Sequence, residues 1–185
     1  MAHVLLGARL LLAAVFATAA AGKLFDVAGS RKALADFGVA QRVVAAAGLL
    51  LPIAELAIAI ALIAQTTARW AALGALLLLL AFLAGIANAL RRGEAPDCHC
   101  FGQIQSAPAG RSTLVRNGVL AGLAAVVVID GPGPVLGDWV AARSAAELVA
   151  VTFGVAAVAL AGWAVVLRRS NRTLRGDLDA AQAEV

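Results

Sequence analysis

A chain of 185 residues that is 62% hydrophobic and only 14% charged cannot hide its apolar side chains in one small core. Soluble domains are roughly 45–50% apolar and about 25% charged, so this composition predicts a protein whose main solvent is the lipid bilayer. The net charge of +4 comes from Lys and Arg in short flanks between apolar runs. That distribution favours membrane anchoring and lipid headgroups and argues against nucleic-acid binding.

Three apolar runs are long enough to cross a membrane, because about 20 helical residues span the hydrocarbon layer. They extend from Val4 to Leu24, from Val43 to Ala64 and from Trp70 to Leu90. The first run, with Arg9 near its start and small residues near its end, also resembles a cleavable signal peptide. We prefer a retained span, because other spans follow it.

The connections between the runs are predicted from their polar residues, Gly and Pro. Residues 27–42 are expected to form a basic loop, and Gly93 to end the third helix. Ser112 is predicted to cap a fourth helix, shorter in its apolar part, which the Gly-Pro-Gly-Pro run after Asp130 stops.

The C-terminal part is predicted to form a fifth helix. Ser144-Ala-Ala-Glu147 has the capping-box pattern, and the helix would run to about Leu167 before a polar juxtamembrane tail with a weak heptad seam. The predicted fold is all-α, a multi-pass transmembrane helical bundle. Its four-helix core occupies residues 1–130, and the fifth helix and tail occupy residues 131–185.

Cys98 and Cys100 are the two cysteines of the chain, and they lie in a polar loop between the third and fourth helices. A Cys-X-Cys pair closes a small, strained disulfide ring, and strained, exposed disulfides are the more oxidising ones. His99 between them and nearby arginines would favour the reactive thiolate; these arginines are Arg91, Arg92 and Arg116. The pattern predicts a thiol–disulfide redox pair.

The same three residues, Cys98, His99 and Cys100, also offer soft ligands for copper, zinc or mercury. Three consecutive residues wrap one ion poorly, and the sequence supplies no second cluster that would complete four-coordination. We therefore predict no metal, while a soft-metal site and a non-catalytic scaffold stay open as alternatives.

Glu55 lies inside an apolar run, where an ionisable side chain is costly and usually functional. Lys23, near the end of the first span, is its expected partner. A proton-handling role and a structural role that joins two helices fit this pair equally well. The connectivity of the spans brings the polar ends of the helices and the cysteine loop to one membrane face.

Motifs in a fixed order carry a resemblance to the MauE family of methylamine utilisation proteins, within the DoxX-like group of small membrane proteins. The resemblance covers roughly residues 5–130, and His99 replaces a residue that is often glycine in the family pattern. The motifs are Gly22-Lys23-Leu24-Phe25-Asp26, Pro52-Ile53-Ala54-Glu55, Asn88-Ala89-Leu90-Arg91-Arg92-Gly93, Cys98-His99-Cys100-Phe101-Gly102 and Leu114-Val115-Arg116-Asn117.

The resemblance implies a four-helix, redox-associated membrane protein that works with a thioredoxin-like partner or a secreted dithiol substrate protein. Cys98 and Cys100 inherit the redox role. A membrane dithiol needs an electron sink, so we expect a quinone, with Lys23 and Glu55 handling protons. The residues expected to bind that quinone are Asn88, Arg92, Phe101 and Arg116.

The side of the membrane on which the cysteine loop lies is predicted in opposite ways by two arguments. The loop after the first span, the cysteine loop and the tail hold most of the Lys and Arg, and the positive-inside rule places them in the cytoplasm. The role implied by the resemblance places the loop outside. We favour the extracytoplasmic side, because several of these arginines belong to the motifs.

Overall fold

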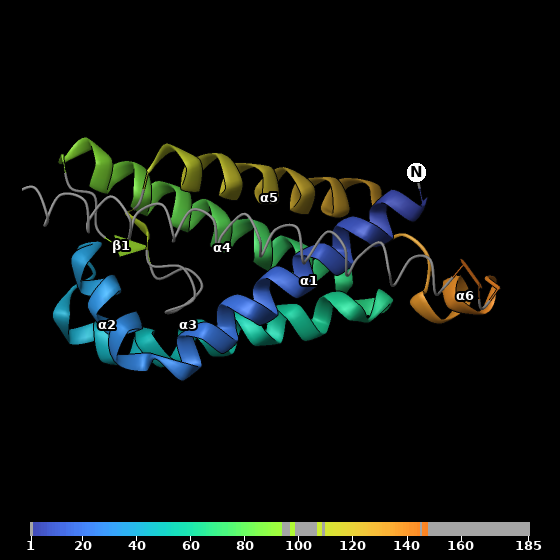
Figure 1. Cartoon of the computed structure of the whole chain (residues 1–185), viewed down its shortest axis with the longest axis horizontal. Coiled ribbons are helices and arrows are strands. Elements are labelled where there is room, and N and C mark those ends of the chain that lie inside the picture. The colour runs from blue at the N-terminus through green and yellow to red at the C-terminus, as the bar shows by residue number, and fades with distance from the viewer. Residues whose placement is uncertain (1, 94–96, 99–106, 109, 145, 148–185) are drawn as a thin grey trace, which may run out of the picture. The chain divides into compact units, whose positions relative to one another are not determined.

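The structure is a computed structural model that describes residues 2–93, 97–98, 107–108, 110–144 and 146–147 (Figure 1). The chain divides into two compact units, Met1–Leu136 and Gly137–Val185. The predicted fifth span and the tail fall on residues 148–185, outside the described residues, so they stay predictions.

The first unit is a bundle of long helices. The spanning helices are α1 (Ala2–Phe25), α3 (Gln41–Ile63), α4 (Gln65–Arg91) and α5 (Arg111–Asp130). These four helices, among the described residues, are long and apolar enough to cross a membrane. Consecutive spanning helices run in opposite directions in Figure 1, as helices that cross a membrane in turn must. The predicted multi-pass all-α bundle is confirmed.

The basic stretch after the first span was predicted to be a loop, and this prediction was wrong. Val27–Asp36 forms a further helix, α2, whose N-cap is Asp26. The Asp26 carboxylate accepts a hydrogen bond from the Gly29 amide at 2.9 Å, which satisfies one of the free amides of the first turn. Gly48 of α3 lies against the Arg31 side chain, so α2 packs closely on α3.

Glycines end two of the spanning helices. Gly93 follows the end of α4 with φ of +75°, and Gly131 follows α5 with φ of +92°. This left-handed backbone favours glycine, so both predicted helix ends are confirmed. The predicted Ser112 cap was wrong: α5 begins at Arg111, and its N-cap is Gly110.

The core of the bundle is built from small and aliphatic side chains. α1 packs against α3 and α5, and α4 packs against α5 and α3. Alanines on the inward faces let the helix backbones approach one another, as is common in membrane bundles. The fully buried core side chains include Leu12, Leu62, Ala72, Ala75, Ala124 and Val127.

A buried arginine joins three segments at one end of the bundle. The Arg9 guanidinium of α1 donates to the Pro132 carbonyl at 2.7 Å and to the Ile63 carbonyl at 3.4 Å. Gln65 of α4 donates to the Gly133 carbonyl at 2.9 Å. These bonds satisfy the carbonyl at the end of α3 and two carbonyls of the Gly-Pro-Gly-Pro segment that follows α5.

A short two-stranded ribbon lies between α4 and α5. Strand β1 (Asp97–Cys98) pairs antiparallel with β2 (Ala107–Pro108), and Cys98 faces Ala107 across the ribbon. The ribbon is an addition to the predicted all-α fold, and it brings together the two ends of the cysteine-containing segment.

The second unit begins within the short helix α6 (Leu136–Ala141). The Ser144 amide donates to the Glu147 carboxylate at 2.9 Å, and the Glu147 amide donates to the Ser144 hydroxyl at 3.3 Å. This reciprocal pair confirms the predicted capping box. The hydrogen bonds from Ser144, first its amide and then its hydroxyl, lower the pKa of the exposed Glu147 carboxyl below its usual value.

Candidate functional site

An ion pair lies inside the bundle between the first two spanning helices. The Lys23 ammonium of α1 donates to both carboxylate oxygens of Glu55 of α3, at 2.7 and 2.9 Å. Lys23 is 6% exposed and Glu55 only 1% exposed. The predicted partnership of these two residues is confirmed.

The sequence of α3 places Glu55 on the inward face. Its buried residues recur at steps of three and four, from Gly48 through Pro52 and Glu55 to Leu62. Pro52 lies one turn before Glu55, and a proline inside a helix lacks the amide that would bond the preceding turn. The helical spacing therefore turns Glu55 toward α1, where Lys23 neutralises it.

Phe82 of α4 covers this ion pair from the side. The Lys23 ammonium lies 5.7 Å from the centre of the Phe82 ring, within the range of a cation–π contact. A small cavity of about 30 Å³ adjoins Lys23, Glu55, Phe82 and Asn117. Asn117 is 5% exposed, and its Nδ2 has no hydrogen-bond partner among the described residues. The cavity has room for one water, and a water there would have polar partners.

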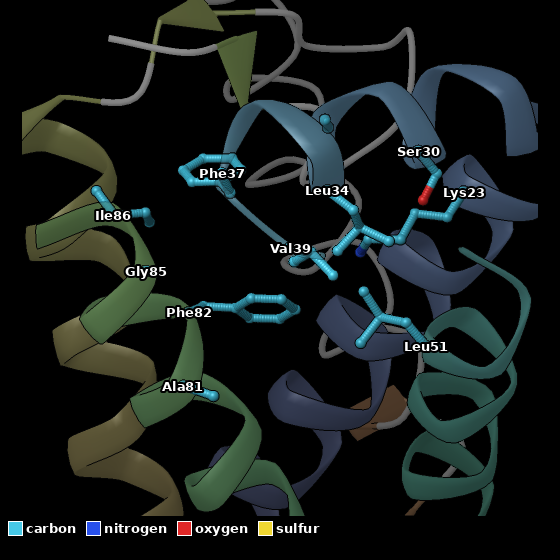
Figure 2. Close-up of a pocket in the computed structure, with 11 residues that line it drawn as sticks. Lys23, Ser30, Leu34, Phe37, Val39, Leu51, Ala81, Phe82, Gly85 and Ile86 are labelled. Atoms are coloured by element: carbon cyan, nitrogen blue, oxygen red, sulfur yellow. The ribbon is translucent and has the colours of Figure 1, made fainter. Parts of the chain in front are cut away.

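A larger cavity of about 180 Å³ lies on the other side of Phe82 (Figure 2). Its wall is apolar apart from Lys23 and Ser30, and Ser30 is only 4% exposed. α2 and α4 supply most of the lining, and α1 and α3 contribute one residue each. The lining residues are Lys23, Ser30, Ala33, Leu34, Phe37, Val39, Leu51, Ala81, Phe82, Gly85 and Ile86.

The other residues singled out in the sequence lie at the same end of the bundle. α1 ends there, α4 ends there, and α5 begins there (Figure 1). Asn88 and Arg92 are exposed at the end of α4, and Arg116 is half-buried on α5. Among the described residues, these three line neither of the two cavities. The polar residues therefore share a face, but of the predicted site residues that the structure describes, Lys23 and Glu55 alone line a cavity.

The cysteine pair cannot be placed as a pair. The backbone of Cys98 belongs to β1, whereas His99, Cys100 and Phe101 lie outside the described residues. An extended strand separates the Cα atoms of residues i and i+2 by roughly 6.6 Å, at the upper limit for a disulfide. A bond between Cys98 and Cys100 would therefore need the backbone to leave the strand conformation after Cys98. The redox and metal interpretations both stay predictions.

Two residues of the site were missed by sequence reasoning. Ser30 lay in the stretch that was predicted to be a loop, and Phe82 lay in a uniformly apolar run that gave no sign of a cavity. Asn117, by contrast, was singled out in a motif, and it lies buried beside the ion pair, at the end of the bundle where the polar residues were expected. Only Ser30 had a detectable signal, because Asp26 has the residue type of a helix N-cap.

A buried, paired acid and base beside an apolar cavity can do two kinds of chemistry. The pair can exchange protons with a ligand in the cavity, or it can hold two helices together without reacting. Because Lys23 lines both cavities and Glu55 lines the smaller one, the ion pair forms part of the wall between them.

The comparisons with known proteins agree with this architecture. The sequence model of the family "Methylamine utilisation protein MauE" matches residues 1–130. The methylamine utilization protein MauE of Paracoccus denitrificans is 35% identical over 184 residues, which cover 97% of this chain and 90% of that protein. No solved structure matches. With the family model over the whole four-helix region and this relative along nearly its full length, the chain is a membrane protein of the MauE family.

Proposed function

We propose that this protein is a membrane thiol–disulfide oxidoreductase that exchanges electrons with a thioredoxin-like partner or a secreted dithiol protein through Cys98 and Cys100. The observation that carries the proposal is the buried Lys23–Glu55 pair, which lies beside a cavity at the same end of the bundle as strand β1, which holds Cys98. Buried charges inside spans are costly, and they usually mark a functional site.

The proposed reaction has two balanced halves. In the first, a partner thiolate attacks one sulfur of the Cys98–Cys100 disulfide and forms a mixed disulfide. The second partner thiol then displaces the other cysteine, so that the partner is oxidised and both cysteines are reduced. In the second half, the two cysteines pass two electrons and two protons to a membrane quinone and close their disulfide again. The reverse flow uses the same bonds.

The position of Cys98 relative to the ion pair supports this proposal. The ribbon of β1 and β2 connects the end of α4 to the start of α5, so Cys98 lies on the membrane face at which Lys23 ends α1. A dithiol at this face has a proton acceptor within the bundle and an aqueous side for a protein partner. We place that aqueous side outside the cytoplasm, where substrate proteins hold disulfides.

The name of the Paracoccus relative ties that protein to methylamine utilization. We propose the same process for this chain, with a disulfide-containing protein of that process as its substrate. In a host that grows on methylamine, deletion of the gene should abolish that growth, and a copy that encodes serine at both cysteine positions should not restore it.

Reconstituted turnover tests the thiol chemistry directly. The full chain in lipid nanodiscs is given a reduced thioredoxin-like protein and a short-tailed quinone, and quinone reduction is followed optically. Wild type should turn over, and the Cys98→Ser/Cys100→Ser variant should not. Each single variant should stop turnover. The one that keeps the attacked cysteine should accumulate a mixed disulfide when the partner's attacking cysteine is first activated as a mixed disulfide with thionitrobenzoate, which leaves as the free thiolate.

The same experiment separates the rival interpretations. A scaffold would leave both single variants without any mixed disulfide while the partner still co-purifies with the double variant. A soft-metal protein would carry copper or zinc in stoichiometric amount that the double variant loses. Normal turnover by the double variant would refute the proposal. Labelling of intact cells with a membrane-impermeant thiol reagent decides the side of the loop.

A further inference from the structure

We propose that the cavity of about 180 Å³ between α2 and α4 binds the ring of a quinone, with Phe82 against the ring and Ser30 donating to a ring carbonyl. The inference rests on the proposed thiol chemistry, which needs a two-electron acceptor in the membrane. It also moves the expected quinone site away from Asn88, Arg92 and Arg116, which do not line this cavity among the described residues.

The size and wall of the cavity select a flat, mostly apolar ligand. Pockets for drug-sized ligands hold roughly 300–1,000 Å³, so a cavity of about 180 Å³ suits a single ring and not a large polar group. Phe37 and Phe82 offer aromatic surfaces from two sides of the cavity (Figure 2). Ala81 also lines it and is exposed on a spanning helix, so the cavity opens toward the lipid.

The charges around the cavity favour an uncharged ligand. Lys23 reaches the wall, but its ammonium is held at 2.7 Å by the Glu55 carboxylate, so the wall carries almost no net charge. An anion would find its positive partner already neutralised. A cation would meet an ammonium group at the wall.

The polar groups on the wall argue against a lipid tail as the occupant. A hydrocarbon chain would lie against the Ser30 hydroxyl without giving it a hydrogen-bond acceptor, and such burial is unfavourable. A quinone carbonyl accepts a hydrogen bond, and Figure 2 shows the Ser30 hydroxyl on the same side of the cavity as Lys23. The pattern of one polar corner and an aromatic wall matches a ring that carries a carbonyl.

The position of the cavity beside Lys23 also provides a route for the protons of the reaction. Reduction of the quinone to the quinol takes two electrons and two protons, and oxidation of two cysteine thiols to a disulfide releases the same number. Lys23 is on the wall of the cavity and Glu55 is bonded to it, so these two groups can pass the protons to the ring oxygens.

Gly85 provides a way to fill the cavity without disturbing the helix. A Cβ added at Gly85 meets no heavy atom within 4 Å, so Gly85→Leu extends into the cavity from α4. Gly122→Leu is the matched control, because a Cβ there also meets nothing within 4 Å and Gly122 is exposed on α5. The probe is a ubiquinone analogue with a ten-carbon tail, titrated into the full chain in nanodiscs.

Gly85→Leu should weaken quinone binding by at least about tenfold, whereas Gly122→Leu should leave it unchanged. Ser30→Ala should weaken binding about three- to tenfold, the loss of one hydrogen bond to a carbonyl. An analogue with the same tail on a plain benzene ring should bind more weakly than the quinone and should not respond to Ser30→Ala. Unchanged binding in Gly85→Leu, or equal binding of the two analogues, would overturn the inference.

The cysteine variants separate this inference from the proposed function. Cys98→Ser/Cys100→Ser should bind the quinone like wild type, although it cannot turn over. If Gly85→Leu loses quinone binding but wild type oxidises no dithiol, the thiol chemistry fails and the ring site stands. If wild type oxidises dithiols with a soluble acceptor but Gly85→Leu binds quinone normally, the ring site fails alone.

Discussion

The Lys23–Glu55 pair can be tested for a structural and a chemical role in one double-mutant cycle. The proposed variants are Lys23→Met, Glu55→Met and the two together. At 2.7 Å, two unit charges attract by on the order of 6 kcal/mol if the effective dielectric constant is about 20. Removing both ions from water offsets much of this attraction, at several kcal/mol per ion.

Each single variant leaves one buried charge without its partner and should lower the free energy of unfolding by about 3–5 kcal/mol. The double variant leaves no charge and should come within about 1 kcal/mol of wild type, because apolar side chains replace a buried ion pair at little cost. Unfolding in lipid bicelles measures all four proteins. Lys32→Met removes an exposed lysine from α2 and serves as the control, with almost no effect.

Turnover of the double variant then separates the two roles. A pair that handles protons should leave the double variant folded but inactive, whereas a purely structural pair should leave it active. The reasoning about burial would be refuted if Lys23→Met cost no more stability than Lys32→Met. Full turnover by the stable double variant would refute the chemical role and keep the structural one.

Three further predictions follow from other contacts. Gly48→Ala puts its Cβ 2.5 Å from the Cγ of Arg31, so the Arg31 side chain must move, and the unfolding free energy should fall by about 1–3 kcal/mol; an unchanged value would contradict the packing. Arg9→Leu should lower the unfolding free energy by about 1.5–3 kcal/mol through its lost charged hydrogen bonds. The pKa of Glu147 is lower in the folded than in the unfolded protein. Its capping box therefore stabilises the fold fully above the unfolded-state pKa, and this stabilisation is lost as pH falls through the folded-state pKa. Ser144→Ala should move that pKa back up in a carbon-13 NMR titration; an unmoved pKa would count against the capping box.

The spanning helices could be predicted because lipid imposes a simple rule on composition. Long apolar runs closed by charged or glycine residues gave α1, α3 and α4 within a few residues of their ends. The partnership of Lys23 and Glu55 could also be predicted, since a charge inside a span needs an opposite charge nearby. These predictions depend only on the cost of burying polar groups.

The helix α2 and the cavity could not be predicted in the same way. The polar composition of residues 27–42 suggested a loop, and the Asp26 cap and the packing of Gly48 under Arg31 outweighed it. Phe82 looked like any other lipid-facing residue in its run. Its position over Lys23 depends on how α4 is rotated against α1, and rotation is set by contacts between helices and not by hydropathy.

The Lys23–Glu55 bond also bears on how the chain enters the bilayer. A lone charged residue near the centre of a spanning segment, as Glu55 is in α3, raises the insertion free energy of that segment by about 2.5–3.5 kcal/mol. Its partner Lys23 lies near the end of α1, and residues 26–40, ten of them in α2, separate these two spans. During biosynthesis the first two spans therefore gain most by leaving the translocation channel together as a hairpin, before the segments that carry Phe82 and Asn117 arrive to enclose them.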